Sequence, residues 1–180
     1  MTLISSFSKI IWFTGLSGSG KTTLANRLNQ LLKKNFKTLR IDGDKVRKKT
    51  KQKSFRKSEI IKNNLSIISF INKKKNNYDF IIVSVISPFL KTRKKARKLF
   101  KQNYIEIYVN CPLSELVKRD TKGLYKLANQ KKINNLIGYK SKIKYEISKY
   151  KKISLNTKNK NIAQCVKNIY DKIVITKNFN

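Results

Sequence analysis

The sequence has little that would build a disulfide framework or a membrane span. Its two cysteines, Cys111 and Cys165, are too few and too far apart for a disulfide framework or a CxxC metal site. We therefore expect both as buried thiols in a reducing compartment. Apolar runs fall well short of the ~20 residues that cross a bilayer, and the first nine residues lack the charged-then-apolar order of a signal peptide. These absences predict a cytoplasmic protein without a membrane partner.

Acidic residues are also scarce, with nine against 43 basic residues and a net charge of +34. Such a charge first suggests a polyanion partner, either nucleic acid or a membrane surface. The basic residues comprise seven arginines and 36 lysines, however, and the lysines occur in every segment of the chain. A nucleic-acid footprint would cluster on one face. We interpret the excess as a composition bias and expect no nucleic-acid partner, although the charge would still steer anionic nucleotides toward the protein.

One motif dominates the 180 residues, a length that fits a single domain spanning 1–180. Residues 15–22 read Gly-Leu-Ser-Gly-Ser-Gly-Lys-Thr, a full match to GxxxxGK[ST], and follow the apolar run 10–13. The glycines allow backbone N–H groups to cradle an anion at the start of the next helix. Lys21 can then reach the β- and γ-phosphates, and the Thr22 hydroxyl can hold Mg²⁺. The alternative, a plain Gly/Ser turn, lacks this strand, loop and helix context.

Strands alternate with helices along the rest of the chain. Apolar patterns predict strands at 10–13, 38–42, 80–86, 104–109 and 153–156, and helices after the motif and at 58–72, 92–101, 112–119 and 162–173. This order predicts an α/β fold of the P-loop NTPase type, a doubly wound, mostly five-stranded parallel sheet with helices on both faces. Residues 45–57 read as a lysine-rich connection. Residues 120–150 lose all periodicity and read as a basic lid.

Candidate catalytic groups follow the predicted strands. Asp42 and Asp44 come after the second strand and Ser87-Pro88 after the third, so both fall on the sheet edge that carries the phosphate loop. Two carboxylates there could orient or deprotonate an acceptor hydroxyl, or help to hold Mg²⁺. The alternative is that Asp42-Gly43-Asp44 is only a turn. No predicted strand ends in the aspartate of a standard Walker B motif. We therefore assign metal binding and orientation of the acceptor to Thr22, Asp42 and Asp44.

Further side chains could neutralise the transferred phosphoryl group or stack on a base. Arg93, Arg119 and Lys122 are candidates for the first role, with solvated surface cations as the alternative. Phe55, Phe89 and Tyr125 are candidates for the second, with core packing as the alternative.

Several segments together resemble adenylylsulfate kinase, which phosphorylates the 3′-hydroxyl of adenylyl sulfate. The matching pieces, in the family's order, are WFTGLSGSGKTT at 12–23, DGD at 42–44 with Val46-Arg47, ISP at 86–88, and Arg119-Asp120 with KGLY at 122–125. The resemblance implies ATP and Mg²⁺ at the phosphate loop. It also implies that Asp44 lies near the acceptor hydroxyl and that Ser87 occupies the position marked as a phosphoserine intermediate. Dimers are common among such proteins, so a homodimer is expected.

The expected site residues divide into three groups. Catalytic residues are Asp44, Asp42, Lys21 and Ser87, and the metal ligand is Thr22. ATP-binding residues are Gly15, Leu16, Ser17, Gly18, Ser19, Gly20, Lys21, Thr22, Thr23 and Arg119. Acceptor-binding residues are Arg47, Phe55, Asn63, Ile86, Ser87, Pro88, Phe89, Lys122, Gly123 and Leu124.

Departures from the family pattern concentrate on the acceptor side. Where the family has an Asp-Arg pair, this chain has Glu59-Ile60. The family's Asn-Ile-Arg-Arg run is Asn-Asn-Leu-Ser here, at 63–66. In the lid, Ile-Lys-Asn-Phe-Thr-Gly is replaced by Ile-Asn-Asn-Leu-Ile-Gly at 133–138. Lost guanidinium groups remove both charge and a bidentate fork.

Three hypotheses follow from these departures. In the first, the chain makes 3′-phosphoadenylyl sulfate for sulfate assimilation, with lysines such as Lys57 and Lys62 binding the anion. In the second, it phosphorylates another activated nucleotide such as cytidine diphosphoramidate, a capsule-modification substrate. In the third, it is a nucleic-acid-binding protein with a relic ATP site. Against this hypothesis, the site residues are intact, namely Lys21, Thr22, Asp42 and Asp44.

Overall fold

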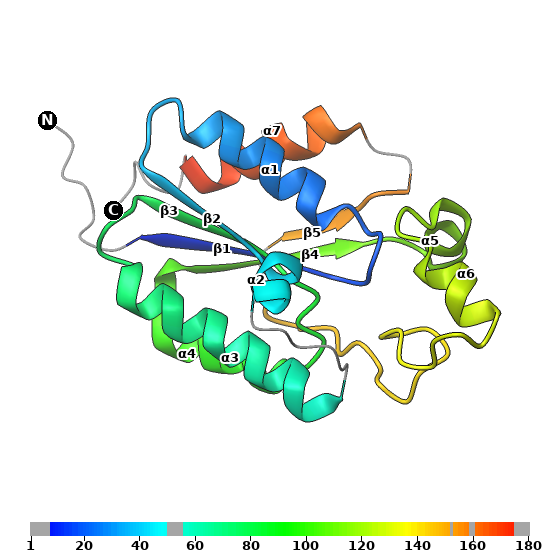
Figure 1. Cartoon of the computed structure of the whole chain (residues 1–180). Helices are drawn as coiled ribbons and strands as arrows, with labels where there is room; N and C mark the ends of the chain where they lie inside the picture. The colour runs from blue at the N-terminus through cyan, green and yellow to red at the C-terminus, as the bar shows by residue number, and fades with distance from the viewer. Residues whose placement is uncertain (1–7, 50–55, 152, 159–160, 175–180) are drawn as a thin grey trace, which may run out of the picture.

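A five-stranded parallel sheet forms the centre of the molecule, in the order β2-β3-β1-β4-β5. The computed structural model describes residues 8–49, 56–151, 153–158 and 161–174 (Figure 1). The strands are β1 (Lys9–Thr14), β2 (Thr38–Asp42), β3 (Phe80–Ser84), β4 (Tyr104–Asn110) and β5 (Ile153–Asn156). The parallel α/β fold class expected from the sequence is therefore confirmed.

Helices cover both faces of this sheet. Figure 1 shows α1 (Lys21–Leu32) and α7 (Ile162–Val174) on one face, and α3 (Lys57–Lys74) and α4 (Leu90–Phe100) on the other. Three short helices, α2 (Gly43–Lys49), α5 (Leu113–Arg119) and α6 (Leu124–Asn129), lie beyond the carboxyl ends of the strands, and the one-turn 3₁₀ helix η1 (Lys101–Asn103) follows α4. Within the described ranges, no helix is both long and apolar enough to cross a membrane.

The central strand β1 has a continuous apolar sequence because its side chains are buried on both faces of the sheet. Its successive side chains point to opposite faces, and both faces are covered. Ile11 and Phe13 join the core under α1 and α7, whereas Ile10 and Trp12 join the core under α3 and α4. Cys111 and Cys165 are buried free thiols, as expected.

Two short helices were not foreseen. Asp42 caps α2 by accepting hydrogen bonds from the backbone N–H groups of Asp44 and Lys45, so the expectation of an irregular connection is wrong for 45–49. Asp120 does the same for α6, within the segment expected to lack structure. Each helix has seven residues or fewer, too short to show a helical period. Strand β3 ends at Ser84, two residues before its predicted end.

Core packing under α1 gives a stability prediction. Leu28 is fully buried between α1 and the sheet, so Leu28→Ala should lower the free energy of unfolding by about 3 kcal/mol through lost burial and a residual cavity. Urea denaturation measures this change. The matched control is Leu99→Ala, because Leu99 of α4 is 41% exposed and its loss should cost below about 1 kcal/mol. Equal losses for the two variants would contradict the described packing.

Candidate active site

The loop of residues 15–20 between β1 and α1 folds as its glycines require. Gly15 has φ 147°, and a Cβ atom there would lie 2.4 Å from the carbonyl oxygen of Val109. Gly20, with φ 95°, turns the chain directly into α1. Only glycine adopts these angles without strain. The loop therefore presents its backbone N–H groups at the start of a 12-residue helix, where an anion is favoured.

Lys21 extends from this helix start into the loop. Its ammonium group donates to the carbonyl oxygen of Leu16 at 2.6 Å and lies 3.5 Å from Ser19 Oγ. The pKa of Lys21 is lowered to about 7, chiefly by burial and also by the nearby ammonium of Lys122, whereas Asp44 and Asp42 act in the opposite direction. The carboxylates of Asp44 and Asp42 therefore do not fully stabilise the positive charge of Lys21. A bound polyphosphate would supply the missing negative charge.

Asp42 connects the helix start to the neighbouring strand. One carboxylate oxygen accepts from Thr22 Oγ1 at 3.1 Å and from Ser84 Oγ at 2.9 Å, while Arg40 lies 3.4 Å away. Burial alone would raise the pKa of Asp42, but the hydrogen bond from Ser84 and the charge of Arg40 outweigh it and hold the pKa below its usual value. Asp42 is therefore an anion beside the Thr22 hydroxyl.

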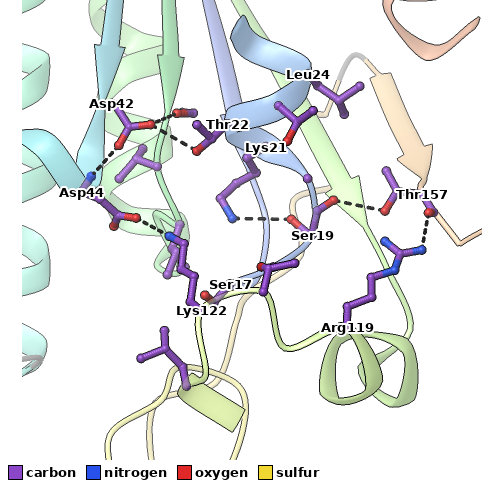
Figure 2. A pocket seen from close by; sticks show the side chains of 18 of the residues that line it. Ser17, Ser19, Lys21, Thr22, Leu24, Asp42, Asp44, Arg119, Lys122 and Thr157 are labelled. Atoms are coloured by element: carbon purple, nitrogen blue, oxygen red, sulfur yellow. Dashed lines mark hydrogen bonds and ion pairs between the residues drawn. The ribbon is translucent and has the colours of Figure 1, made fainter. Parts of the chain in front are cut away.

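Asp44 and Lys122 face each other across the site (Figure 2), with Lys122 Nζ 2.5 Å from Asp44 Oδ2. Their side chains are about half exposed, at 51% and 49%. Asp44 comes from the first turn of α2 and Lys122 from the link between α5 and α6. An exposed pair of this kind is weak and exchanges readily for a ligand.

Two cavities meet at Asp44. The larger, of about 1010 Å³, contains these predicted site residues in its wall: Ser17, Gly18, Ser19, Gly20, Lys21, Thr22, Thr23, Asp42, Asp44, Arg47, Ile86, Arg119, Lys122 and Leu124. The smaller, of about 40 Å³, contains Asp44, Arg47, Asn63, Ile86, Ser87 and Pro88. Since both walls include Asp44, Arg47 and Ile86, the cavities are neighbours, with Asp44 at the boundary.

The far end of the larger cavity is closed by the segment after β5. Arg119 donates to the carbonyl oxygens of Thr157 and Lys158, at 2.8 and 3.0 Å (Figure 2). Thr157 in turn donates to the carbonyl oxygen of Ser19 at 3.1 Å. Sequence reasoning missed Thr157 and Lys158, which belong to no motif, and it also missed the support that Arg40 and Ser84 give to Asp42.

The smaller cavity is lined by oxygen acceptors from α3. Glu59 Oε2, Asn63 Oδ1 and Asn64 Oδ1 are buried and have no hydrogen-bond partner among the described residues. Lys57 and Lys62, proposed as substitute anion-binding residues, line neither cavity, and the Lys57 ammonium lies 5.6 Å from the centre of the Phe89 ring. Arg47 is thus the basic residue in the smaller cavity's wall.

Several predicted residues are absent from the wall of the larger cavity. Ser87 is buried, its hydroxyl lies 3.4 Å from Thr92 Oγ1, and it borders only the smaller cavity. Phe89 packs in a core cluster with Ile60 and Ile137. Gly123, with φ 65°, begins α6, and Gly15 and Leu16 shape the loop from outside the walls. Phe55 lies outside the described residues.

Two other candidates are structural. Arg93 is 1% exposed and ion-paired with Glu106 at 3.2 Å, so its assignment to the transferred phosphoryl group is wrong. Tyr125 is buried, and its hydroxyl donates to the carbonyl oxygen of Ser17 at 2.9 Å, which ties α6 to the phosphate loop. Of its two interpretations, core packing is confirmed.

The donor set fits a magnesium ion that is shared with phosphates. Thr22 presents an exposed hydroxyl beside the Asp42 carboxylate, and Mg²⁺ prefers such oxygen donors together with water and substrate phosphates. Among the described residues, no group of three or more His, Cys, Asp or Glu side chains could cage a metal alone. A phosphate loop, a buried lysine and a hydroxyl beside a carboxylate define a P-loop phosphotransferase.

Comparison with known proteins identifies the family within this class. The family model described as adenylylsulphate kinase matches residues 7–156. The adenylyl-sulfate kinase of Clostridium acetobutylicum is 37% identical over 164 residues, covering 90% of this chain and 81% of that protein. That of Prochlorococcus marinus is 39% identical over 170 residues, with coverages of 93% and 84%. The chain belongs to the adenylylsulfate kinase family.

A solved structure agrees with this assignment. The Mycobacterium tuberculosis APS kinase CysC in complex with AMPPNP and APS superposes with a TM-score of 0.83 at 26% identity, covering 94% of this chain and 99% of that one.

The lowered pKa of Lys21 predicts proton uptake on nucleotide binding. Phosphate favours the ammonium form, so MgATP affinity should be flat below about pH 7 and fall above it by up to about tenfold per pH unit. Calorimetry at pH 8 in two buffers of different ionisation enthalpy should report uptake of close to one proton. Lys21→Met is the control and should abolish the uptake. A wild-type protein that binds MgATP at pH 8 without proton uptake would contradict the lowered pKa.

Proposed function

We propose that this protein transfers the γ-phosphoryl group of ATP to the 3′-hydroxyl of adenylyl sulfate, giving 3′-phosphoadenylyl sulfate and ADP. Family membership supports the reaction class. The observation that carries the proposal is the position of Asp44, which borders both the cavity of the phosphate loop and the smaller cavity beside it. An acceptor hydroxyl at that boundary would meet a carboxylate on one side and the phosphate donor on the other.

The proposed chemistry is direct in-line transfer, in which the protein forms no covalent bond to the phosphoryl group. The acceptor oxygen forms a bond to the γ-phosphorus while the bond to the β-phosphate oxygen breaks. Asp44 orients the hydroxyl and accepts its proton as the bond forms. Lys21 and Lys122 lie on the same cavity wall and stabilise the charge on the transferred group. No step requires a covalent Ser87 intermediate, and its hydroxyl lies beside Thr92.

Mg²⁺ is the proposed cofactor, held by the Thr22 hydroxyl with Asp42 behind it. When bound between phosphates, the ion would neutralise part of their charge. Arg119, Thr157 and Lys158 would border the nucleoside end of ATP, because they line the larger cavity away from Asp44. We also propose a cytoplasmic location, where ATP is supplied, and a homodimer.

Adenylyl sulfate is the favoured acceptor despite the acceptor-side substitutions, since adenylyl-sulfate kinases are among the relatives at 37–39% identity. Arg47 is the cation proposed to meet an anionic group of the acceptor. The buried oxygens of Glu59, Asn63 and Asn64 would accept hydrogen bonds from N–H donors such as an exocyclic amino group.

Initial rates of ADP release test the proposal. Purified protein with MgATP should turn over adenylyl sulfate faster than cytidine diphosphoramidate at matched concentrations, and Lys21→Ala provides the blank. Turnover of the cytidine compound alone would refute the proposed acceptor while keeping the reaction class. Inactivity on both, with a salt-sensitive shift of DNA, would favour the nucleic-acid hypothesis.

Asp44→Asn separates catalysis from ATP binding. Loss of the proton acceptor should lower kcat by about 10²- to 10⁴-fold, with the Kd for MgATP nearly unchanged because Lys21 and the loop remain. Asp171→Asn in α7, outside both cavity walls, is the matched control and should leave kcat unchanged. If Asp44→Asn keeps wild-type kcat, Asp44 is not the proton acceptor.

A further inference from the structure

Residues 86–88, which link β3 to α4, have each of their three carbonyl oxygens held by a different part of the chain. Thr14 Oγ1 donates to the first at 2.5 Å, the Arg93 guanidinium donates to the second, and the backbone N–H of Glu146 donates to the third at 2.9 Å. All three residues line the smaller cavity. The shape of that cavity wall is therefore set by groups that lie outside it.

The segment of residues 139–150, here called the strap, reaches this wall through Tyr145. The Tyr145 and Thr14 hydroxyl oxygens are 2.8 Å apart. Because Thr14 has one hydroxyl proton and gives it to the carbonyl oxygen of residue 86, Tyr145 is the donor in this pair. Burial raises the pKa of Tyr145 well above its ordinary value, so the hydroxyl keeps its proton. A hydrogen-bond relay thus runs from the strap to the wall.

Arg93 joins the strap to the wall by a second route. Besides its bond to the wall, the guanidinium donates to the carbonyl oxygen of Glu146 and lies 5.1 Å from the centre of the Tyr145 ring. Its ion pair with Glu106, at 3.2 Å, fixes the group on β4. A planar fork with several donors can hold two carbonyl oxygens at once.

Glu146 adds a third connection at the start of α4. Its carboxylate accepts from the backbone N–H of Leu90 at 2.5 Å, where a negative charge is favoured by the helix dipole. Neither Tyr145, Glu146 nor Arg93 belongs to the wall of either cavity.

We propose that Tyr145 is a positioning residue for the acceptor: through Thr14, its hydroxyl holds the 86–88 wall of the acceptor cavity in the productive shape. The identity of the acceptor rests on the proposed function, but the mechanical link does not. The strap then acts mainly on acceptor affinity, because Ser87 and Pro88 border the smaller cavity alone and only Ile86 also borders the larger one.

Tyr145→Phe removes one hydroxyl and keeps the ring, which stacks on Tyr108 with centroids 5.4 Å apart. Loss of the relay should raise the KM for adenylyl sulfate about fivefold, the equivalent of one net hydrogen bond. The KM for MgATP should stay within about twofold, because no group of the phosphate loop is changed. Steady-state kinetics with each substrate varied in turn provides this split.

Tyr139→Phe is the matched control. Tyr139 belongs to the same strap, but its hydroxyl donates to Asn129 Oδ1 at 2.6 Å and, among the described residues, makes no hydrogen bond to the 86–88 wall. It should leave both KM values unchanged. A similar loss of acceptor affinity in the two variants would mean that the strap acts through its general packing and not through the Tyr145 hydroxyl. That result would overturn the proposal.

Hydrogen exchange separates this proposal from the choice of acceptor. The peptide spanning 84–92 should exchange several-fold faster in Tyr145→Phe than in wild type or Tyr139→Phe, with the melting temperatures of all three alike. If wild type is inactive on adenylyl sulfate yet this difference is seen, the proposed acceptor fails and the positioning role stands. Unchanged exchange, or an unchanged acceptor KM in an active enzyme, overturns the positioning role.

Discussion

The Asp42 carboxylate is the interaction on which the arrangement of the site depends. It accepts from Thr22 at the start of α1, from Ser84 at the end of β3, and from two backbone N–H groups that begin α2. The hydrogen bond from Ser84, the charge of Arg40, and the hydrogen bonds from Lys45 and Thr22 together hold the pKa of Asp42 below its usual value despite burial. Because α2 carries Asp44 and Arg47, the carboxylate that accepts from the Thr22 hydroxyl also positions two residues that line both cavities.

Charge in the site is organised around substrates that bring negative charge. Burial deprives Lys21 of water, and Asp42 and Asp44 only partly compensate its cation. Lys122 meanwhile pairs with Asp44, which is half exposed. A polyphosphate would satisfy both lysines and release Asp44 for the acceptor hydroxyl. The overall charge of +34 would steer such ligands toward the protein.

The sequence predicted those features that short-range chemistry determines. Glycine spacing located the phosphate loop, and continuous apolar runs such as 10–13 identified strands covered on both faces. Helices α2 and α6 were missed because six or seven residues show no helical period, and because the aspartate that accepts from the first turn of α6, Asp120, lies four residues before that helix. Arg93 was misassigned because the sequence does not show that it pairs with Glu106, which belongs to another element, β4.

Residues of the acceptor side were the hardest to place from sequence. Asn63 lines the smaller cavity, whereas Phe89 packs in the core, and only the folded chain brings Tyr145 to Thr14, 131 positions away. Such contacts depend on sheet order and loop closure, which no local pattern encodes.

Analysis of the reaction product by phosphorus NMR tests the central claim most directly. With adenylyl sulfate and MgATP, the account predicts a new phosphomonoester signal coupled to the ribose H3′ proton, formed in equal amount with ADP. Inorganic phosphate as the sole new phosphorus species beside ADP would mean that water, and not a hydroxyl beside Asp44, receives the phosphoryl group, and would contradict the account.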